Sequence, residues 1–392
     1  MKKRKGTSRK KKINPIVLLI ILLPFLACVV LLSLYLIFSD NSDTILSPLY
    51  EEIYSSATSL NESIERIDYT IYESLYESGV QEKDIFFLSV QPRHQNGHVW
   101  EFSEILINCV DNQFALNLRE VINHELKALG KGIRLKREKI SKSRITCHVF
   151  AKDFLTHKII LSVDDFQPAI RDFRPRIAII IDDLGYNSNT DFSFFELDLP
   201  LSFSVLPYGP FTQQIVRKAN EEGCELILHL PMEPKNYPTA DPGPGGLFCC
   251  MDEKKIRQVL DQDLRQITGV QGVNNHMGSS FTEDREKMLI VLNELKKRGL
   301  FFIDSRTTKG TVALDLAREI GLPAARRRVF LDNNLAPKAM KIQMERLLSM
   351  ARYLGVAIGI GHPYEETFRL LKQYSSKIKN EFQIVPVSEL LG

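Results

Sequence analysis

The chain has 392 residues, 44% of them hydrophobic and 25% charged, a composition typical of globular proteins that excludes a wholly disordered chain. Eight of its 51 lysine and arginine residues lie between Lys2 and Lys12, and they account for the formal net charge of +3. The rest of the chain holds all 48 acidic residues and is slightly negative, so nothing beyond the tail indicates nucleic-acid binding.

The N-terminal segment predicts a membrane anchor. A basic tail (1–15) is followed by an uncharged, apolar stretch (16–38) that is long enough to cross the hydrocarbon core of a bilayer. The absence of a small-residue cleavage site after it favours an uncleaved anchor over a secretory signal. Since basic residues stay cytoplasmic, we expect a single-pass protein of the inner (cytoplasmic) membrane, whose residues after Asp40 face the periplasm or the extracellular side.

Between the anchor and a proline-containing linker (166–175), the sequence predicts a helical stalk (41–79) and a small α+β domain (80–165). The stalk has apolar residues mostly three, four or seven positions apart. For the small domain we expect strands at 85–90, 100–110, 144–151 and 158–163, and a helix at 114–129. A disulfide between Cys109 and Cys147 is compatible with an exported domain, but we favour buried thiols.

From residue 176 to 392 the expected elements alternate regularly. The predicted strands are 177–181, 201–206, 224–229, 270–275, 300–304, 325–331, 355–360 and 382–386. The predicted helices are 211–222, 252–268, 283–298, 311–320, 337–353 and 364–378. This alternation indicates a mostly parallel α/β sheet or an incomplete β/α barrel. Its active face would be the carboxyl ends of the strands, where the long proline- and glycine-rich loop 231–249 should also lie.

Polar residues recur at these predicted strand ends. Asp182 and Asp183 follow an apolar run, and His229, His276 and His362 each follow a later one. A single histidine at a strand end is more often structural than functional. Three of them on the face that carries an Asp-Asp pair predict a metal site instead.

Asp183, His229 and His276 would supply one carboxylate and two imidazoles to a divalent metal. This donor set suits Zn²⁺ best, and also Fe²⁺, Co²⁺ or Mn²⁺. Asp182 is placed to act as a general base and His362 to protonate a leaving group. The chemistry predicted from these residues is metal-assisted hydrolysis of an acyl or amide bond.

At these positions the chain resembles the divergent polysaccharide deacetylase family, a branch of the polysaccharide deacetylase superfamily. The similarity runs from about residue 176 to 391 and rests on five motifs in order: Ile-Ile-Asp182-Asp183-Leu-Gly, His229-Leu-Pro-Met-Glu-Pro, Asn-Asn-His276-Met-Gly-Ser, Ile-Asp304-Ser-Arg306-Thr and Ile-Gly-His362-Pro. The resemblance implies a distorted β/α barrel in residues 176–392. It also implies Asp182 as base, Asp183 and His229 as metal ligands, and His362 as acid.

The chain departs from the main superfamily in the second motif. That motif is His-x-x-x-His-Pro, but the matching stretch here has Glu233 in place of the second histidine. Either Glu233 binds the metal or His276 has taken over this role, and we favour His276. The departure also bears on whether deacetylase activity is retained.

Two further sets of residues allow two interpretations each. Asp304, with Arg306, either orients and tunes the catalytic base or forms an ion pair that closes a loop. The triplet Arg326–Arg328 either faces an anionic glycan or phosphate or is a solvated basic strand end, and we favour the solvated end.

The leading hypothesis is a membrane-anchored, outward-facing metallohydrolase that removes acetyl groups from an envelope polysaccharide. Its partners would be the glycan and the membrane, with no nucleic acid. The alternative is a non-catalytic glycan-binding or scaffold protein that keeps the same barrel. Asp182 beside a metal ligand favours the enzyme, whereas Glu233 in the second motif favours the alternative.

Overall fold

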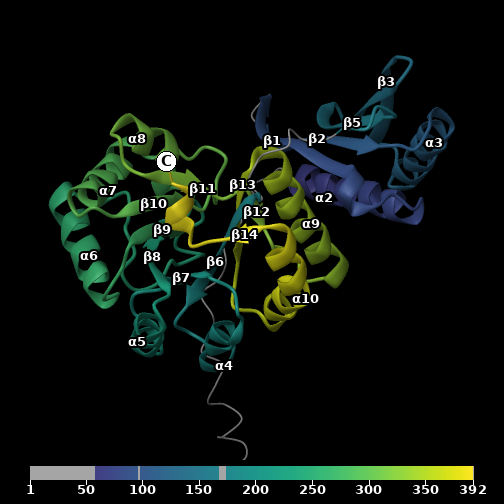
Figure 1. Ribbon diagram of the computed structural model, residues 1–392. Coiled ribbons are helices and arrows are strands. Elements are labelled where there is room, and N and C mark those ends of the chain that lie inside the picture. Colours follow the sequence, from purple (N-terminus) through teal and green to yellow (C-terminus); the bar gives the residue numbers. More distant parts are fainter. Residues whose placement is uncertain (1–57, 96–97, 167–173, 392) are drawn as a thin grey trace, which may run out of the picture. The chain divides into compact units, whose positions relative to one another are not determined.

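The computed structural model describes residues 58–95, 98–166 and 174–391, which belong to one compact unit (Figure 1). Within these ranges no helix is both long and apolar enough to cross a membrane. The predicted basic tail, the anchor at 16–38 and the first part of the stalk lie outside the described residues. The stalk's helical character holds for residues 58–77.

The first described elements form a five-stranded sheet with two helices. They are α2 (Thr58–Glu77), β1 (Ile85–Gln95), β2 (His98–Asn108), α3 (Asn112–Ala128), β3 (Ile133–Ile140), β4 (Arg144–Ala151) and β5 (Phe154–Ser162). The strand order is β1-β2-β5-β4-β3, with β2 and β5 parallel and the other pairs antiparallel. Both helices contact this sheet and each other. Cys109 and Cys147 are buried and form no disulfide in the described part of the chain.

The four strands and the helix expected in this segment are present, but β3 was missed. In its sequence Ile133 and Leu135 alternate with basic residues, and residues 136–139 are then all charged before Ile140, so the apolar signal of a strand is short. Buried contacts join the segment to helix α9 (Pro337–Leu354): the Ser349 hydroxyl donates to the Ile85 carbonyl at 3.0 Å, and Arg346 pairs with Asp68 at 2.6 Å. The separate domain boundary at 166–175 stays a prediction.

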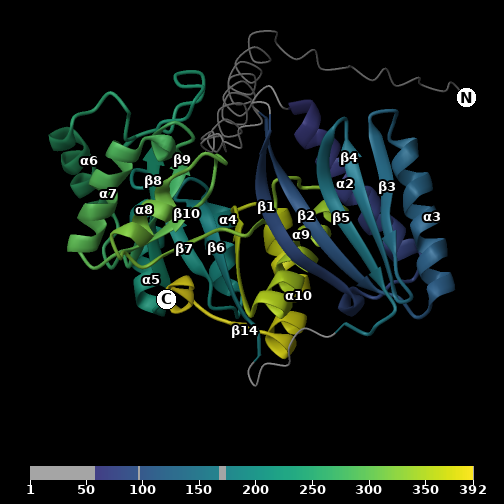
Figure 2. The same ribbon diagram turned by 90° about the horizontal axis from the view of Figure 1, so that it is seen from above.

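The C-terminal part is a curled parallel sheet with helices on its outer side (Figures 1 and 2). The strands are β6 (Arg176–Leu184), β7 (Ser202–Val205), β8 (Glu225–Met232), β9 (Gly272–Met277), β10 (Phe301–Asp304), β11 (Ala324–Arg326), β12 (Val329–Phe330), β13 (Val356–Gly361) and β14 (Gln383–Ile384). The other helices are α4 (Ser188–Ser193), α5 (Thr212–Glu222), α6 (Glu253–Gln266), α7 (Arg285–Lys297), α8 (Ala313–Glu319) and α10 (Glu365–Glu381). The prediction of an α/β fold with a parallel barrel-like sheet is confirmed at this level.

Local sequence explains where these elements begin and end. Strand β6 is a continuous apolar run whose residues 177–181 are all fully buried, as expected for a parallel strand covered on both faces. Helix α6 starts where the Asp252 carboxylate accepts the backbone N–H of Lys255. Helix α5 ends at Gly223, whose left-handed backbone closes the last turn.

The predicted strand 325–331 is wrong in one respect, because this segment forms two short strands that pair with different neighbours. The sheet order is β11-β10-β9-β8-β7-β6-β13-β12, so β11 and β12 are its two edges. Between them the Arg327 amide donates to the Asp304 carbonyl, and the Arg328 amide donates to the Ile358 carbonyl. The chain thus crosses from one edge to the other and partly closes the barrel. Helix α4 was also not expected from the sequence.

Candidate metal centre and active site

Asp182 and Asp183 lie near the end of strand β6, on an irregular piece of backbone. Between Ile181 and Leu184 this strand has one more residue than its neighbour β7, which is a β-bulge. Asp183 has a φ of 58°, in the left-handed region that non-glycine residues rarely adopt. Consecutive side chains of a regular strand point to opposite faces. The bulge instead lets both aspartates reach one buried cluster.

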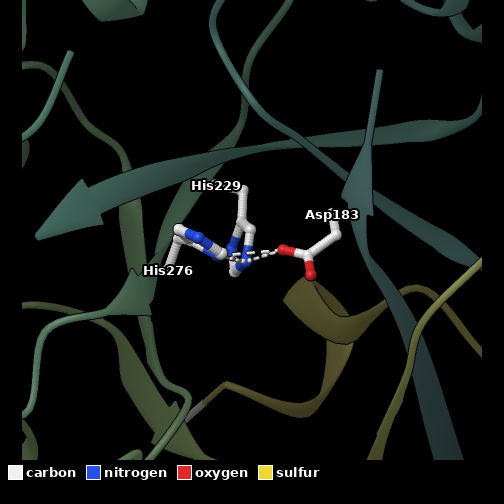
Figure 3. Close-up of side chains that lie close together, drawn as sticks. All are labelled: Asp183, His229 and His276. Atoms are coloured by element: carbon white, nitrogen blue, oxygen red, sulfur yellow. Dashed lines mark hydrogen bonds and ion pairs between the residues drawn. The ribbon is translucent and has the colours of Figure 1, made fainter. Parts of the chain in front are cut away.

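The cluster consists of Asp183, His229 on β8 and His276 on β9, whose side chains point toward one another (Figure 3). Asp183 Oδ1 lies 2.9 Å from His229 Nε2 and 2.9 Å from His276 Nδ1. The two ring nitrogens are 3.2 Å apart. Donor atoms bound to one zinc ion at its usual bond lengths stand about 3.3 Å apart, so these three atoms fit a common divalent cation.

Burial and charge strengthen this fit. All three residues are buried, and Asp183 Oδ1 has no hydrogen-bond donor of proper geometry. Burial alone would raise the pKa of Asp183, but the imidazoles of His276 and His229 outweigh it and hold that pKa well below its usual range. An ionised, buried carboxylate oxygen facing two imidazole nitrogens is an arrangement that a bound cation would stabilise.

Asn274, on β9 beside His276, fixes how His229 is oriented. Its amide nitrogen donates to Asp182 Oδ1 at 2.8 Å, so its amide oxygen must face the other way, 2.8 Å from His229 Nδ1. An amide oxygen only accepts, which places a proton on Nδ1 and makes Nε2, the nitrogen that faces Asp183, the one whose lone pair a cation would use. Ser204 donates to the same oxygen at 2.7 Å. Asn274 is not among the site residues predicted from the sequence.

His362, at the end of β13, pairs with a carboxylate that the sequence analysis left without a role. His362 Nδ1 lies 2.9 Å from Asp332 Oδ1, and Asp332 Oδ2 accepts from the His362 amide at 2.5 Å and from the Thr367 hydroxyl at 2.6 Å. Burial disfavours the charged imidazole, but Asp332, with smaller shares from Asp183 and Asp182, raises the pKa of His362 to about 9. The signal for Asp332 was its position directly after a predicted strand.

The model of the divergent polysaccharide deacetylase family matches residues 179–391, more than half of the chain. The chain belongs to this family. It is 31% identical over 217 residues to the uncharacterized protein YibQ of Escherichia coli, covering 55% of this chain and 67% of that one. It is 30% identical over 215 residues to an uncharacterized protein of Haemophilus influenzae, covering 55% of this chain and 76% of that one.

A solved structure agrees with this assignment. The crystal structure of the uncharacterized protein ATU2773 from Agrobacterium tumefaciens superposes with a TM-score of 0.54 at 26% identity, covering 57% of this chain and 92% of that chain. The similarity therefore concerns the deacetylase-like barrel.

Within this deacetylase-like barrel, Glu233 contacts the backbone of the long loop and is not part of the Asp183, His229 and His276 cluster. Its carboxylate accepts from the Cys249 amide at 2.6 Å, and its own amide donates to the Leu247 carbonyl at 2.8 Å. Through these hydrogen bonds, Glu233 stabilises the long loop predicted at 231–249. His276 and Glu233 are the two candidates for the role of the missing histidine. The structure places His276, and not Glu233, beside Asp183 and His229.

The catalytic role predicted for Asp304 is not reflected in its contacts. Its carboxylate accepts from the Arg306 amide at 2.9 Å and from the Thr311 hydroxyl at 3.1 Å, so it holds the loop after β10. No hydrogen bond or ion pair in the described part of the chain joins it to the cluster, and the Arg306 guanidinium pairs with Glu101 at 3.0 Å. Burial raises the pKa of Asp304, as expected for a carboxyl inside the barrel wall.

Replacing Asn274 with leucine, which has a similar volume, should weaken metal binding by roughly tenfold to a hundredfold. The variant loses the oxygen that accepts from His229 Nδ1, while all three candidate ligands remain. The affinity is measured by titrating metal into the apoprotein. Ser204→Ala is the matched control, since it removes only a second donor to the same oxygen. Equal losses in both variants would contradict the role assigned to Asn274.

Proposed function

We propose that this protein is a metal-dependent hydrolase that removes acetyl groups from a polysaccharide of the cell envelope. The observation that carries the proposal is that Asp183, His229 and His276 converge next to Asp182. The His362 imidazole, which pairs with Asp332, is close enough for the charges of Asp182 and Asp183 to raise its pKa further. A binding site for glycans needs no general base beside a metal ligand, whereas metal-assisted hydrolysis uses both.

Asp183, His229 and His276 would hold a divalent cation, with Zn²⁺ as our first choice from the donor set. When bound, such a cation polarises an acetyl carbonyl and makes a neighbouring water more acidic. Membership of a generally metal-dependent family supports this assignment.

Asp182 would take a proton from the attacking water. Asn274 donates to Asp182 Oδ1, and no described residue donates to Oδ2, so the second oxygen has a lone pair for this purpose. The same hydrogen bond keeps the carboxylate from rotating away. Asp182 thereby stays next to the metal ligands while remaining outside the ligand set.

His362 would donate a proton to the departing sugar oxygen or nitrogen. Asp332 accepts from its Nδ1 side and keeps the ring charged at neutral pH. A charged imidazole next to the site is a ready general acid. Phe330 stacks on the ring at 5.5 Å between centroids and restricts its orientation.

The pH profile should report this pair. Because the pKa of His362 is raised to about 9, its acid form persists through neutral pH and turnover should fall as the pH rises through that region. Asp332→Asn removes the main charge that raises this pKa, so the alkaline limb of kcat should move to lower pH. Rates measured from pH 6 to 10 for both proteins test this. An unmoved limb would exclude His362 as the acid.

The cellular setting is part of the proposal and rests on the sequence. The basic tail and apolar segment would anchor the protein in the inner membrane, with the barrel outside the cytoplasm, where envelope glycans are the available substrates. The alternative, a glycan-binding or scaffold protein with the same barrel, is supported by the departure at Glu233.

The deciding experiment uses the full chain purified in detergent. Its metal content is measured, and acetate release is followed on a panel of acetylated glycans before chelation, after chelation and after adding back single metals. We expect acetate release that is lost with the chelator and restored by a divalent ion. A metal-loaded protein that releases no acetate from any glycan of the panel would favour the non-catalytic alternative.

A further inference from the structure

The barrel wall is open on one side, between β11 and β13. Among the described strands, β11 pairs with β10 alone, and β13 pairs with β12 at Gly359 and Ile360 alone. Along Ala324–Arg326 and Val356–Ile358 the two strands face one another without pairing, and both stretches line a hollow of about 530 Å³. A hollow of this volume lies in the range of small-molecule binding sites.

Three arginines line this hollow: Arg318 from α8, and Arg326 and Arg328 from the segment that crosses between the sheet edges. Arg326 and Arg328 are two positions apart, so an extended chain turns both side chains to the same side. Arg327, between them, is used elsewhere. Its guanidinium donates to the Ser305 carbonyl at 2.8 Å and packs over the Phe330 ring.

These three guanidinium groups have no ion-pair partner among the described residues, and no acidic residue lines the hollow. Asp304 and Asp315 are near enough to act on Arg326 through their charge, but neither forms an ion pair with it. Burial, and then the neighbouring arginine charges, lower the pKa of Arg328. Grouped positive charges that are partly removed from water favour an anion between them.

The rest of the lining is apolar. It includes Leu314, Leu322, Pro323 and Leu390, and Val356, which keeps 42% of its surface exposed although it is a large aliphatic residue. A ligand that matched only the arginines would leave this surface facing water. A ligand with an anionic head and an apolar body would cover both parts.

We propose that this hollow, which we name the arginine pocket, binds a small amphiphilic anion. The phosphate monoester head of the ligand would lie against Arg318, Arg326 and Arg328, and its apolar body against the aliphatic lining. The arginine pocket is separate from the proposed active site. Ile358 lines it, whereas His362 lies four residues further along the chain, about 13 Å at the rise of a β-strand. The site adds a ligand class that the hydrolytic function does not require.

Monobutyl phosphate is the probe, and inorganic phosphate and 1-butanol each supply one half of it. Binding to the full chain in detergent is measured by calorimetry at fixed ionic strength. We expect saturable binding of monobutyl phosphate that is at least tenfold tighter than that of inorganic phosphate, and none for 1-butanol. Equal affinity for both phosphates would overturn the apolar half of the proposal, and no binding of either would overturn the whole.

Variants assign the two halves to residues. Arg326→Gln and Arg328→Gln should each weaken both phosphates at least tenfold, and Val356→Thr, which is nearly isosteric, should weaken only the butyl ester. Arg265→Gln and Arg369→Gln remove exposed arginines elsewhere and control for net charge. Arg328→Lys keeps the positive charge but lacks the planar guanidinium group. It shows whether weaker binding by Arg328→Gln comes from a folding defect. Equal weakening by the controls would show that only overall charge is sensed and would overturn the site.

Discussion

Replacing His276 with alanine should leave the protein without stoichiometric metal, whereas Glu233→Gln should leave the metal in place. His276 Nδ1 lies 2.9 Å from Asp183 Oδ1, so its loss would remove one of the three protein ligands that we propose. The Glu233 carboxylate instead accepts a backbone amide of the long loop, and a glutamine oxygen can accept the same hydrogen bond. The measurement is metal content per chain after gel filtration, with His229→Ala as a second ligand variant.

The reverse outcome would be decisive as well. If Glu233→Gln empties the site and His276→Ala leaves it full, the ligand set is Asp183, His229 and Glu233, and the loop must rearrange when metal binds. Circular dichroism and thermal unfolding of each variant separate loss of metal from loss of fold. Unfolding of His276→Ala in the absence of metal would be judged against metal-free wild type.

The alternation of strands and helices after residue 176 was predictable because each buried strand is a short apolar run and each helix has its own apolar stripe. The two short strands in segment 324–330 were not predictable, because they belong to opposite edges of the sheet, and these edges come close together only in the folded chain. Local sequence carries no signal for such a meeting. Strand β3 was missed for a different reason, since its charged residues hide an edge strand.

The same distinction applies to the site. Asp183, His229 and His276 were predictable as a group because the carboxyl ends of parallel strands lie at one edge of the barrel. Asn274 and Asp332 were not assigned, because their importance lies in hydrogen bonds to His229 and His362 across strands that are far apart in sequence. Asp304 sits at an equivalent strand end, yet its carboxylate turns to its own loop. A position at a strand end therefore predicts which edge of the barrel a residue lies at, but not which group its side chain contacts.

Replacing Asp182 with asparagine should preserve the metal and lower kcat by roughly 10² to 10⁴, the loss expected for a positioned general base. The asparagine oxygen can still accept from Asn274, so the orientation of Asn274 and the tautomer of His229 should persist. Only the capacity to take a proton is lost. Asp183→Asn should differ by losing metal and activity together, since Asp183 contacts both imidazoles.

Asp304→Asn is the matched control for this experiment. Asp304 is also a buried aspartate at a strand end, but its carboxylate contacts the Arg306 amide and the Thr311 hydroxyl, so turnover should stay close to that of wild type. Metal content, kcat and KM are measured for wild type and all three variants on the same panel of acetylated glycans. If Asp304→Asn loses turnover while retaining metal and Asp182→Asn does not, the base lies at β10 rather than β6. If wild type with full metal content shows no more hydrolysis than Asp182→Asn, the barrel does not act as a hydrolase on these glycans and binding becomes its better supported role.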